Sequence, residues 1–207
     1  MNHKMNLGDV TPLTEVYWQR SCLSEFEIEK IKELHELDDT RHEAKIGFGE
    51  GNVNSNYRRS TVSWFTPEFI EKHNCQDIVN KIGNEVNMIN DQIFKFDLLE
   101  IEPLQVTKYD SHNKGMYNPH TDTNAHQRNI TRKLSFVIQL SDLDDFEGGS
   151  FVYESNLEAV NVRETQPHTL AKGNIIVFPS FLTHGVLPVT RGVRYSLVGW
   201  CIGQRFR

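Results

Sequence analysis

The chain has 207 residues, of which 38% are hydrophobic, which is enough for a sizeable core and too much for a disordered chain. Its 22 Lys and Arg against 28 Asp and Glu give a net charge of −6, which argues against non-specific nucleic-acid binding because that rests on clustered basic residues. There is no apolar run long enough to span a bilayer and no signal-peptide pattern at the start. We therefore expect a soluble cytoplasmic protein without a membrane or nucleic-acid partner.

Helical signals dominate the first 98 residues. Ser24 with Glu27 three positions later is a capping-box pattern, which predicts a helix start. The apolar face expected for this helix comprises Phe26, Ile31, Leu34 and Leu37. Thr66-Pro67-Glu68 predicts a second helix start, with proline at the first helical position. A third helical stripe comprises Ile78, Ile82, Val86, Ile89 and Ile93.

Between these helices, residues 59–65 (RSTVSWF) read as a strand and residues 41–57 as a glycine-rich loop. The loop and the adjacent Arg58 have two equally weighted interpretations: a lid that binds substrate, or a solvated connector. Tyr57 and Arg59 are candidate substrate contacts, although a surface ion pair is the preferred interpretation of Arg59. Gly148-Gly149 predicts a tight turn.

From about residue 99 the apolar period changes to two. The strand-like segments are LLEIEPLQVTKYD, RKLSFVIQL, GSFVYE, EAVNVR, NIIVFP, HGVLPV and VRYSLVGWC. Short strands separated by turn residues, without intervening helices, indicate a sandwich or barrel. We predict an α+β fold in a single domain spanning residues 1–207. It has a jelly-roll core, a double-stranded β-helix, over 99–203, and helices from the support region 1–98 pack on one sheet.

The segment YNPHTD places His120 and Asp122 two residues apart. If the segment is extended, both side chains point to the same face and can converge on one ion. A lone H-x-D pattern occurs often by chance, and a third ligand is needed. His184 is the candidate, because it follows a buried strand and a proline turn in NIIVFPSFLTHG. Two histidines and one carboxylate form the facial triad of non-haem Fe(II) oxygenases.

Arg194 lies ten residues after His184, in VRYSLVGW. On a strand it shares one face with Ser196 and Trp200. An arginine pointing into a barrel is costly unless a carboxylate meets it, and it can hold that carboxylate with two parallel hydrogen bonds. A small dicarboxylate would satisfy both the arginine and the open metal positions, with Ser196 as an additional donor.

These segments, from Tyr109 to Trp200, resemble the prolyl 4-hydroxylase-like branch of the Fe(II)- and 2-oxoglutarate-dependent dioxygenases. The matching pieces are QVTKYD, YNPHTD, RKLSFVIQL, EGGSFVY and KGNIIVFPSFLTHGVLPVTRGVRYSLVGW. The first 98 residues match more loosely, through LSEFEIEKI and RRSTVSWF. Many prolyl hydroxylases carry lysine near the position of Arg194, so the chain departs from them there.

The resemblance implies that His120, Asp122 and His184 bind Fe(II), and that Arg194 pairs with the distal carboxylate of 2-oxoglutarate. It further implies that Tyr109, with Ser196, hydrogen-bonds this co-substrate, and that ascorbate is an accessory cofactor. Trp200 would lie deeper on the same face and, with Arg59 and Tyr57, would contact substrate. His126 is expected on the surface or behind the ligands.

Three functions remain open at this point. The first is hydroxylation of a peptidyl residue, above all proline, in a protein or peptide partner. The second is hydroxylation of a free amino acid or other small metabolite, which a more enclosed site would favour. The third is a jelly-roll binding module without catalysis, which loss of a metal ligand would have favoured. The three distant cysteines, Cys22, Cys75 and Cys201, predict free thiols in a reducing cytosol.

Overall fold

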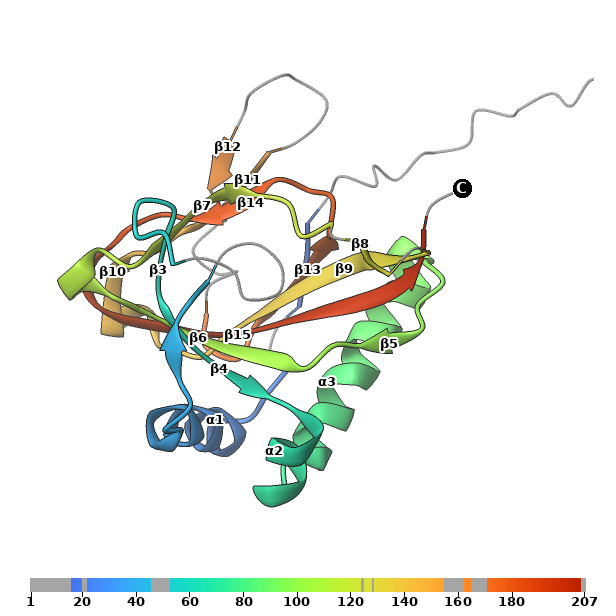
Figure 1. Cartoon of the computed structure of the whole chain (residues 1–207), viewed down its shortest axis with the longest axis horizontal. Coiled ribbons are helices and arrows are strands. Elements are labelled where there is room, and N and C mark those ends of the chain that lie inside the picture. The colour runs from blue at the N-terminus through green and yellow to red at the C-terminus, as the bar shows by residue number, and fades with distance from the viewer. Residues whose placement is uncertain are drawn as a thin grey trace, which may run out of the picture.

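The computed structural model describes residues 16–19, 22–45, 53–123, 125–127, 129–154, 162–164 and 171–205. Two antiparallel sheets lie one above the other, and the helices lie on the far side of the larger sheet (Figure 1). The α+β jelly-roll fold predicted from the sequence is confirmed, and the arrangement leaves the space between the two sheets for a site.

The larger sheet runs through the middle of the molecule. Its strands, in spatial order, are β1 (Tyr17–Gln19), β13 (Ile175–Pro179), β9 (Ile130–Gln139), β15 (Val189–Gln204), β6 (Leu104–Asp110), β4 (Thr61–Phe65) and β2 (His42–Glu43). Three short strands pair at its margins: β5 (Glu100–Ile101), β8 (Ala125–Gln127) and β10 (Phe146–Gly148). Strand β15 has 16 residues and pairs with β9 on one side and β6 on the other, so it is the central strand of this sheet.

The smaller sheet covers the other side of the site. Its order is β12 (Val162–Glu164), β11 (Phe151–Glu154), β14 (His184–Val186), β7 (Met116–His120) and β3 (Arg58–Arg59). The segment that contains H-x-D is therefore extended as far as His120, as the metal hypothesis requires. The turn before β11 is confirmed, since Gly148 and Gly149 have φ angles of 71° and 63°, a region that glycine enters without steric cost.

The main core lies between the larger sheet and the helices α1 (Glu25–Leu37), α2 (Pro67–Lys72) and α3 (Gln76–Ile89). Four stripe residues predicted for the third helix, Ile78, Ile82, Val86 and Ile89, are buried. Ile93 falls in the π-helical turn η1 (Asn90–Phe94) that follows α3. Two short 3₁₀ turns, η2 (Ser111–Asn113) and η3 (Leu143–Asp145), complete the elements.

The predicted apolar face of α1 was partly wrong. The capping box of Ser24 and Glu27 forms as predicted, but Phe26 and Leu37 are 79% and 68% exposed. The buried side chains are Ile28, Ile31 and His35, whose spacing of three and four residues keeps them on one face of a helix. Phe26 lies off that face, and His35 takes a core position that an apolar pattern does not reveal.

Two strand predictions also needed adjustment. The strand expected over 59–65 is broken at Ser60 into β3 and β4, which belong to different sheets. HGVLPV is likewise split, because β14 ends at Val186 and β15 begins at Val189, after Pro188. Residues 46–52 of the predicted loop lie outside the described residues, as do residues 158–161 of EAVNVR.

The prediction that the three cysteines are free thiols is confirmed, since Cys22, Cys75 and Cys201 are buried and unpaired within the described residues. No helix in the described ranges combines the length and the apolar character that crossing a membrane requires.

Candidate metal centre and active-site cavity

The smaller sheet brings the three predicted ligands together. His120 at the end of β7 and His184 at the start of β14 are direct partners in the antiparallel ladder, which sets their side chains next to each other. Asp122 follows β7 by two residues, and its backbone N–H donates to the carbonyl oxygen of Ser180 over 2.8 Å. That bond holds Asp122 beside the two imidazoles.

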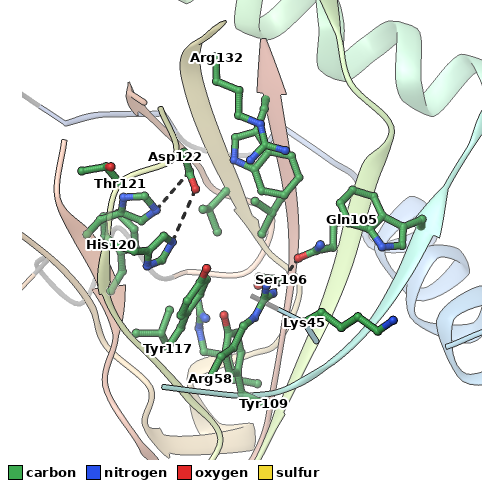
Figure 2. A pocket seen from close by; sticks show the side chains of 18 residues that line it. Lys45, Arg58, Gln105, Tyr109, Tyr117, His120, Thr121, Asp122, Arg132 and Ser196 are labelled. Atoms are coloured by element: carbon green, nitrogen blue, oxygen red, sulfur yellow. Dashed lines mark hydrogen bonds and ion pairs between the residues drawn. The ribbon is translucent and has the colours of Figure 1, made fainter. Parts of the chain in front are cut away.

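The ligand atoms converge on one point, as Figure 2 shows. Nε2 of His184 lies 3.3 Å from Oδ2 of Asp122, and Nε2 of His120 lies 3.6 Å from Oδ1. One ligand atom from each residue lies within 4.8 Å of the other two. Two imidazoles and one carboxylate at such spacing can hold a divalent first-row metal on one side of its coordination sphere.

The tautomers of the two histidines fit a metal. Nδ1 of His120 contacts the carbonyl oxygen of Asn118 at 2.8 Å, and Nδ1 of His184 contacts that of Leu182 at 2.9 Å. A carbonyl only accepts hydrogen bonds, so each Nδ1 must carry the proton and donate it. When both imidazoles are neutral, each Nε2 turns a lone pair toward the Asp122 carboxylate. Lone pairs facing a carboxylate repel it unless a cation lies between them, and this is the observation that fits the metal.

Burial and charge favour the protonation states that a metal needs. Burial lowers the pKa of His120 to about 4, so its imidazole is neutral near pH 7. Burial alone would raise the pKa of the Asp122 carboxyl, but the neighbouring His184 and His120 and the hydroxyl of Ser135 outweigh it and lower that pKa. A neutral imidazole and an ionised carboxylate are the ligating forms.

A pair of buried serines orients the carboxylate. The hydroxyl of Ser135, on β9, donates to Oδ2 of Asp122 over 2.8 Å, and its Oγ lies 3.0 Å from Oγ of Ser180. Because Oδ2 accepts this bond, Oδ1 has the freer lone pairs on the side of His120. Hydrogen bonds of this kind fix the orientation of a metal ligand.

Aromatic rings enclose the imidazoles. Tyr117 stacks on His120 with ring centroids 3.6 Å apart, and Phe178 meets His184 edge to face at 4.5 Å. Phe151 lies 5.7 Å from His184. These rings restrict imidazole rotation and keep water away from the ligands.

The cluster opens into a cavity of about 170 Å³ between the two sheets. The side chains that line it come from both sheets: Lys45, Arg58, Trp64, Gln105, Tyr109, Tyr117, His120, Thr121, Asp122, Arg132, Val137, Phe151, His184, Val186, Arg194, Ser196, Val198 and Trp200. The metal cluster belongs to the smaller sheet, whereas Arg194 and Tyr109 belong to the larger one.

Arg194 lies in this cavity with its charge uncompensated. It is 1% exposed, and its Nε and Nη1 atoms have no hydrogen-bond partner among the described residues. Burial lowers its pKa, but a guanidinium stays charged in proteins. Tyr109, its partner in the ladder, lies beneath the guanidinium at 5.6 Å from ring centroid to Cζ. A buried unpaired charge is costly, so Arg194 fits an anion that enters the cavity.

Ser196 and Trp200 follow Arg194 on the same face of β15 and also line the cavity. The indole Nε1 of Trp200 is buried and has no hydrogen-bond partner in the part of the chain that the structure describes. Arg132 lies over the Trp200 ring at 3.9 Å, and its Nε donates to Oε2 of Glu102 over 2.5 Å. Trp200 is thus held between the sheet and a cation that already has an acidic partner.

The two other residues expected near substrate do not line the cavity. Arg59 donates from Nε to the carbonyl oxygen of Lys114 and from Nη1 to that of Ser55, so it ties backbone segments together. The expected ion pair of Arg59 is replaced by these bonds. The hydroxyl of Tyr57 donates to the carbonyl oxygen of Pro119 over 2.9 Å. The side chain of His126 lies outside the described residues.

Several lining residues were missed at the sequence level, above all Gln105, Tyr117 and Arg132. Gln105, Thr107 and Tyr109 alternate along β6, which is buried at almost every position. Polar residues at every second position of a buried strand indicate a polar cavity on that face, and this signal was available. No comparable local signal marks Arg58, whose role depends on β3 joining the smaller sheet.

Residues 104–202 match the family model of the 2OG-Fe(II) oxygenase superfamily. A PKHD-type hydroxylase of Synechococcus sp. (strain CC9605) is 40% identical over 84 residues, which are 41% of this chain and 35% of the relative. A PKHD-type hydroxylase of Idiomarina loihiensis is 37% identical over 84 residues, also 41% and 35% of the two chains. The chain therefore spans about a third of the length of these curated relatives.

Solved structures show the same fold at low sequence identity. A Pseudomonas putida prolyl-4-hydroxylase has a TM-score of 0.67 and 21% identity, over 93% of each chain. A Trichoplax adhaerens prolyl hydroxylase, solved with a peptide fragment of the hypoxia inducible factor oxygen degradation domain, has a TM-score of 0.72 and 14% identity, over 91% of this chain and 83% of its own.

The fold and the cluster thus define a jelly-roll protein with a candidate two-histidine, one-carboxylate metal centre. Residues 104–202 match the 2OG-Fe(II) oxygenase superfamily model and lie within the fold shared with the prolyl hydroxylase structures, so the resemblance inferred from the sequence is confirmed at the level of this match. Fe(II) and 2-oxoglutarate are the metal and co-substrate of this superfamily, and the donor set described above fits both.

Proposed function

We propose that the chain is an Fe(II)- and 2-oxoglutarate-dependent hydroxylase. The observation that carries this proposal is the content of one cavity: three electron-pair donors converge at one end, and a buried guanidinium without a partner lies elsewhere in its wall. A divalent metal satisfies the first group and a carboxylate satisfies the second. A short dicarboxylate that also binds the metal satisfies both.

In this proposal each residue has a limited task. His120, Asp122 and His184 hold Fe(II) from one side, which leaves positions for co-substrate and O₂. Arg194 binds the distal carboxylate of 2-oxoglutarate with two hydrogen bonds, and Tyr109 and Ser196 line the same part of the cavity. The metal and co-substrate together supply the oxidation, in which O₂ and 2-oxoglutarate become succinate, CO₂ and one hydroxyl group on the substrate.

The protein also shapes the surroundings of the reaction. The Ser135 hydrogen bond fixes the Asp122 carboxylate, and the Asn118 and Leu182 carbonyls fix the imidazole tautomers. The rings of Tyr117, Phe151 and Phe178 keep water from the imidazoles. Donation of each Nδ1 proton to a carbonyl raises the basicity of the imidazole, and exclusion of water protects a reactive centre from solvent.

The substrate that we propose is a peptidyl proline. The Trichoplax adhaerens prolyl hydroxylase was solved in complex with a peptide fragment, which supports a peptide substrate at this fold. The second candidate is a free amino acid or small metabolite, favoured by the modest volume of about 170 Å³. The non-enzymatic alternative, a jelly-roll binding module, is disfavoured because all three candidate ligands and Arg194 face one cavity.

We further propose that residues 1–207 work as one dioxygenase domain in the cytoplasm. The support for one domain is a shared core, in which Ile31 of α1 and Ile82 of α3 lie in the same cluster as Val106 of β6. The support for a reducing compartment is that the three cysteines are unpaired thiols.

The proposal is tested by supplying Fe(II), 2-oxoglutarate and O₂ with candidate proline peptides and free amino acids. Mass spectrometry should detect succinate and a substrate product heavier by one oxygen, about 16 Da. His120→Ala and Asp122→Ala should abolish both products because each removes a donor to the metal. Ascorbate, the accessory cofactor expected from the sequence, is included in one arm and omitted from another.

A matched control is His112→Ala, because the His112 side chain is 94% exposed and lies outside the cavity. It should retain the wild-type yield. If His120→Ala and Asp122→Ala turn over like the His112 control, the cluster is not the catalytic centre.

A further inference from the structure

A second arginine of the cavity also lacks an anionic partner. Arg58, on β3, is 8% exposed, and its Nη2 donates to Oε1 of Gln105 over 2.8 Å while its Nε donates to Oγ of Ser60 over 3.1 Å. Both partners are neutral. None of the acidic side chains in the described ranges contacts it. A nearly buried cation held only by neutral groups retains a cost that an anion would remove.

Arg58 lies close to the three candidate metal ligands. Its guanidinium carbon lies 4.4 Å from the centroid of the Tyr117 ring, which also stacks on His120 with ring centroids 3.6 Å apart. One aromatic ring therefore separates the guanidinium from a metal ligand. An anion bound by Arg58 would lie beside the place where a substrate must present the carbon to be oxidised.

The formal charges of the loaded cavity single out Arg58. Fe(II) carries two positive charges, which Asp122 and the metal-bound carboxylate of 2-oxoglutarate neutralise. The distal carboxylate of 2-oxoglutarate neutralises Arg194, and Glu102 neutralises Arg132. Lys45 is exposed, and Figure 2 shows its side chain extending away from His120 and Asp122. Arg58 is then the buried charge that metal and co-substrate leave without a counter-charge.

We propose that Arg58 binds a carboxylate of the substrate, so that the enzyme selects acidic substrates. This inference rests on the proposed function, because the charge count requires metal and 2-oxoglutarate in the same cavity. The carboxylate has two possible sources: the α-carboxylate of a free amino acid, or an acidic side chain next to a peptidyl proline. The guanidinium recognises the same chemistry in both, with two parallel hydrogen bonds.

The test uses two pairs of probes that differ only in the carboxylate. The first pair is free L-proline and L-prolinamide. The second is a peptide blocked at both ends with aspartate beside proline, and the same peptide with asparagine. Binding is measured by calorimetry on the full chain loaded with Mn²⁺ and 2-oxoglutarate without O₂. A readout of binding separates recognition at Arg58 from any effect on turnover.

We expect the acid of one pair to bind the wild-type protein about 10- to 100-fold more tightly than its amide, which is the size of a charge-assisted hydrogen bond. Arg58→Gln should remove this preference, and Arg58→Lys should retain part of it because the cation remains. Arg59→Gln is the matched control. It alters the next residue, which bonds to backbone carbonyls outside the cavity, and should keep the wild-type preference. If only free L-proline binds more tightly than its amide, the carboxylate is that of a free amino acid. If only the aspartate peptide binds more tightly than the asparagine peptide, it is an acidic side chain beside proline.

The failures of the two proposals are distinguishable. A wild-type protein that binds neither Mn²⁺ nor 2-oxoglutarate contradicts the proposed function itself. If it binds both but prefers no acid over its amide, or binds no acid measurably, the role of Arg58 is refuted. A preference that survives Arg58→Gln in a folded variant refutes it as well, and equal binding of acid and amide would assign Arg58 to a peptide carbonyl instead.

Discussion

Ser135 on β9 and Asp122, two residues after β7, meet through a hydrogen bond of 2.8 Å from the serine hydroxyl to Oδ2. This bond lets the carboxylate present one oxygen to the metal in a fixed direction. Ser135→Ala should therefore weaken metal binding by about 10- to 100-fold, as removal of such partners does at other metal sites. Titration of the apo protein with Mn²⁺ measures the effect.

The control for Ser135 is Ser63→Ala. Ser63 is also buried, but its hydroxyl contacts His35 and it does not line the cavity. Metal affinity should be unchanged in this variant. An affinity in Ser135→Ala equal to that of wild type would show that the aspartate is oriented by its backbone bond to Ser180 alone.

Metal binding should stabilise the fold. Three candidate ligand atoms lie within 4.8 Å of one another, and a metal that binds only the folded state adds about 2.7 kcal/mol at a concentration of about 100 times Kd. Thermal unfolding with and without Mn²⁺ should show a rise in Tm for the wild type. His184→Ala should abolish the rise, whereas His42→Ala, an exposed histidine of β2, should leave it intact.

Arg194→Met should have two opposite effects. Without co-substrate it should raise Tm, because it removes a buried charge that has no partner. With 2-oxoglutarate, the Kd should rise by at least about 30-fold, because loss of one partner of a buried charge pair costs about 2–5 kcal/mol. Arg191→Met is the control, since Arg191 lies on the same strand but is exposed and pairs with Glu147. A lower Tm in apo Arg194→Met would contradict the reasoning.

Stability should fall in mild acid through His35. Burial lowers the pKa of His35 from 6.5 to about 4, so the unfolded chain binds more protons than the folded chain between these values. Stability from neutral His35 is present above pH 6.5 and is lost as the pH falls toward 4. Between about pH 7 and about pH 5 the wild type should lose about 2 kcal/mol more than His35→Asn. Urea unfolding at both pH values measures this, and equal losses would show that His35 does not titrate in this range.

Much of the site could be predicted because its key residues carry local signals. His120 and Asp122 share a short motif, His184 follows a buried strand and a turn, and Arg194 stands out in an apolar strand. Their roles as ligands remain a prediction that the metal titrations test. The jelly-roll core was equally visible, because an alternating apolar pattern reports which face of a strand is buried.

Other cavity residues could not be predicted, because their positions depend on which strands pair, and the sequence does not show this. Arg58 reaches the cavity because β3 adds to the edge of β7, with Arg58 opposite Tyr117, and such a two-residue strand has no period of its own. Arg59, one position along, points to backbone carbonyls instead. The predicted apolar face of α1 was partly wrong for a related reason. Packing against the rest of the protein buries His35 and leaves Leu37 exposed.

The division of the cavity between two sheets has a mechanical consequence. His120 and His184 belong to the smaller sheet and Arg194 to the larger one. A dicarboxylate bound by the metal at one end and by Arg194 at the other would therefore connect the two sheets. Amide hydrogens of β7 and β15 should then exchange more slowly, and with matched kinetics, once it is bound. The co-substrate would thereby link the local opening of the two sheets.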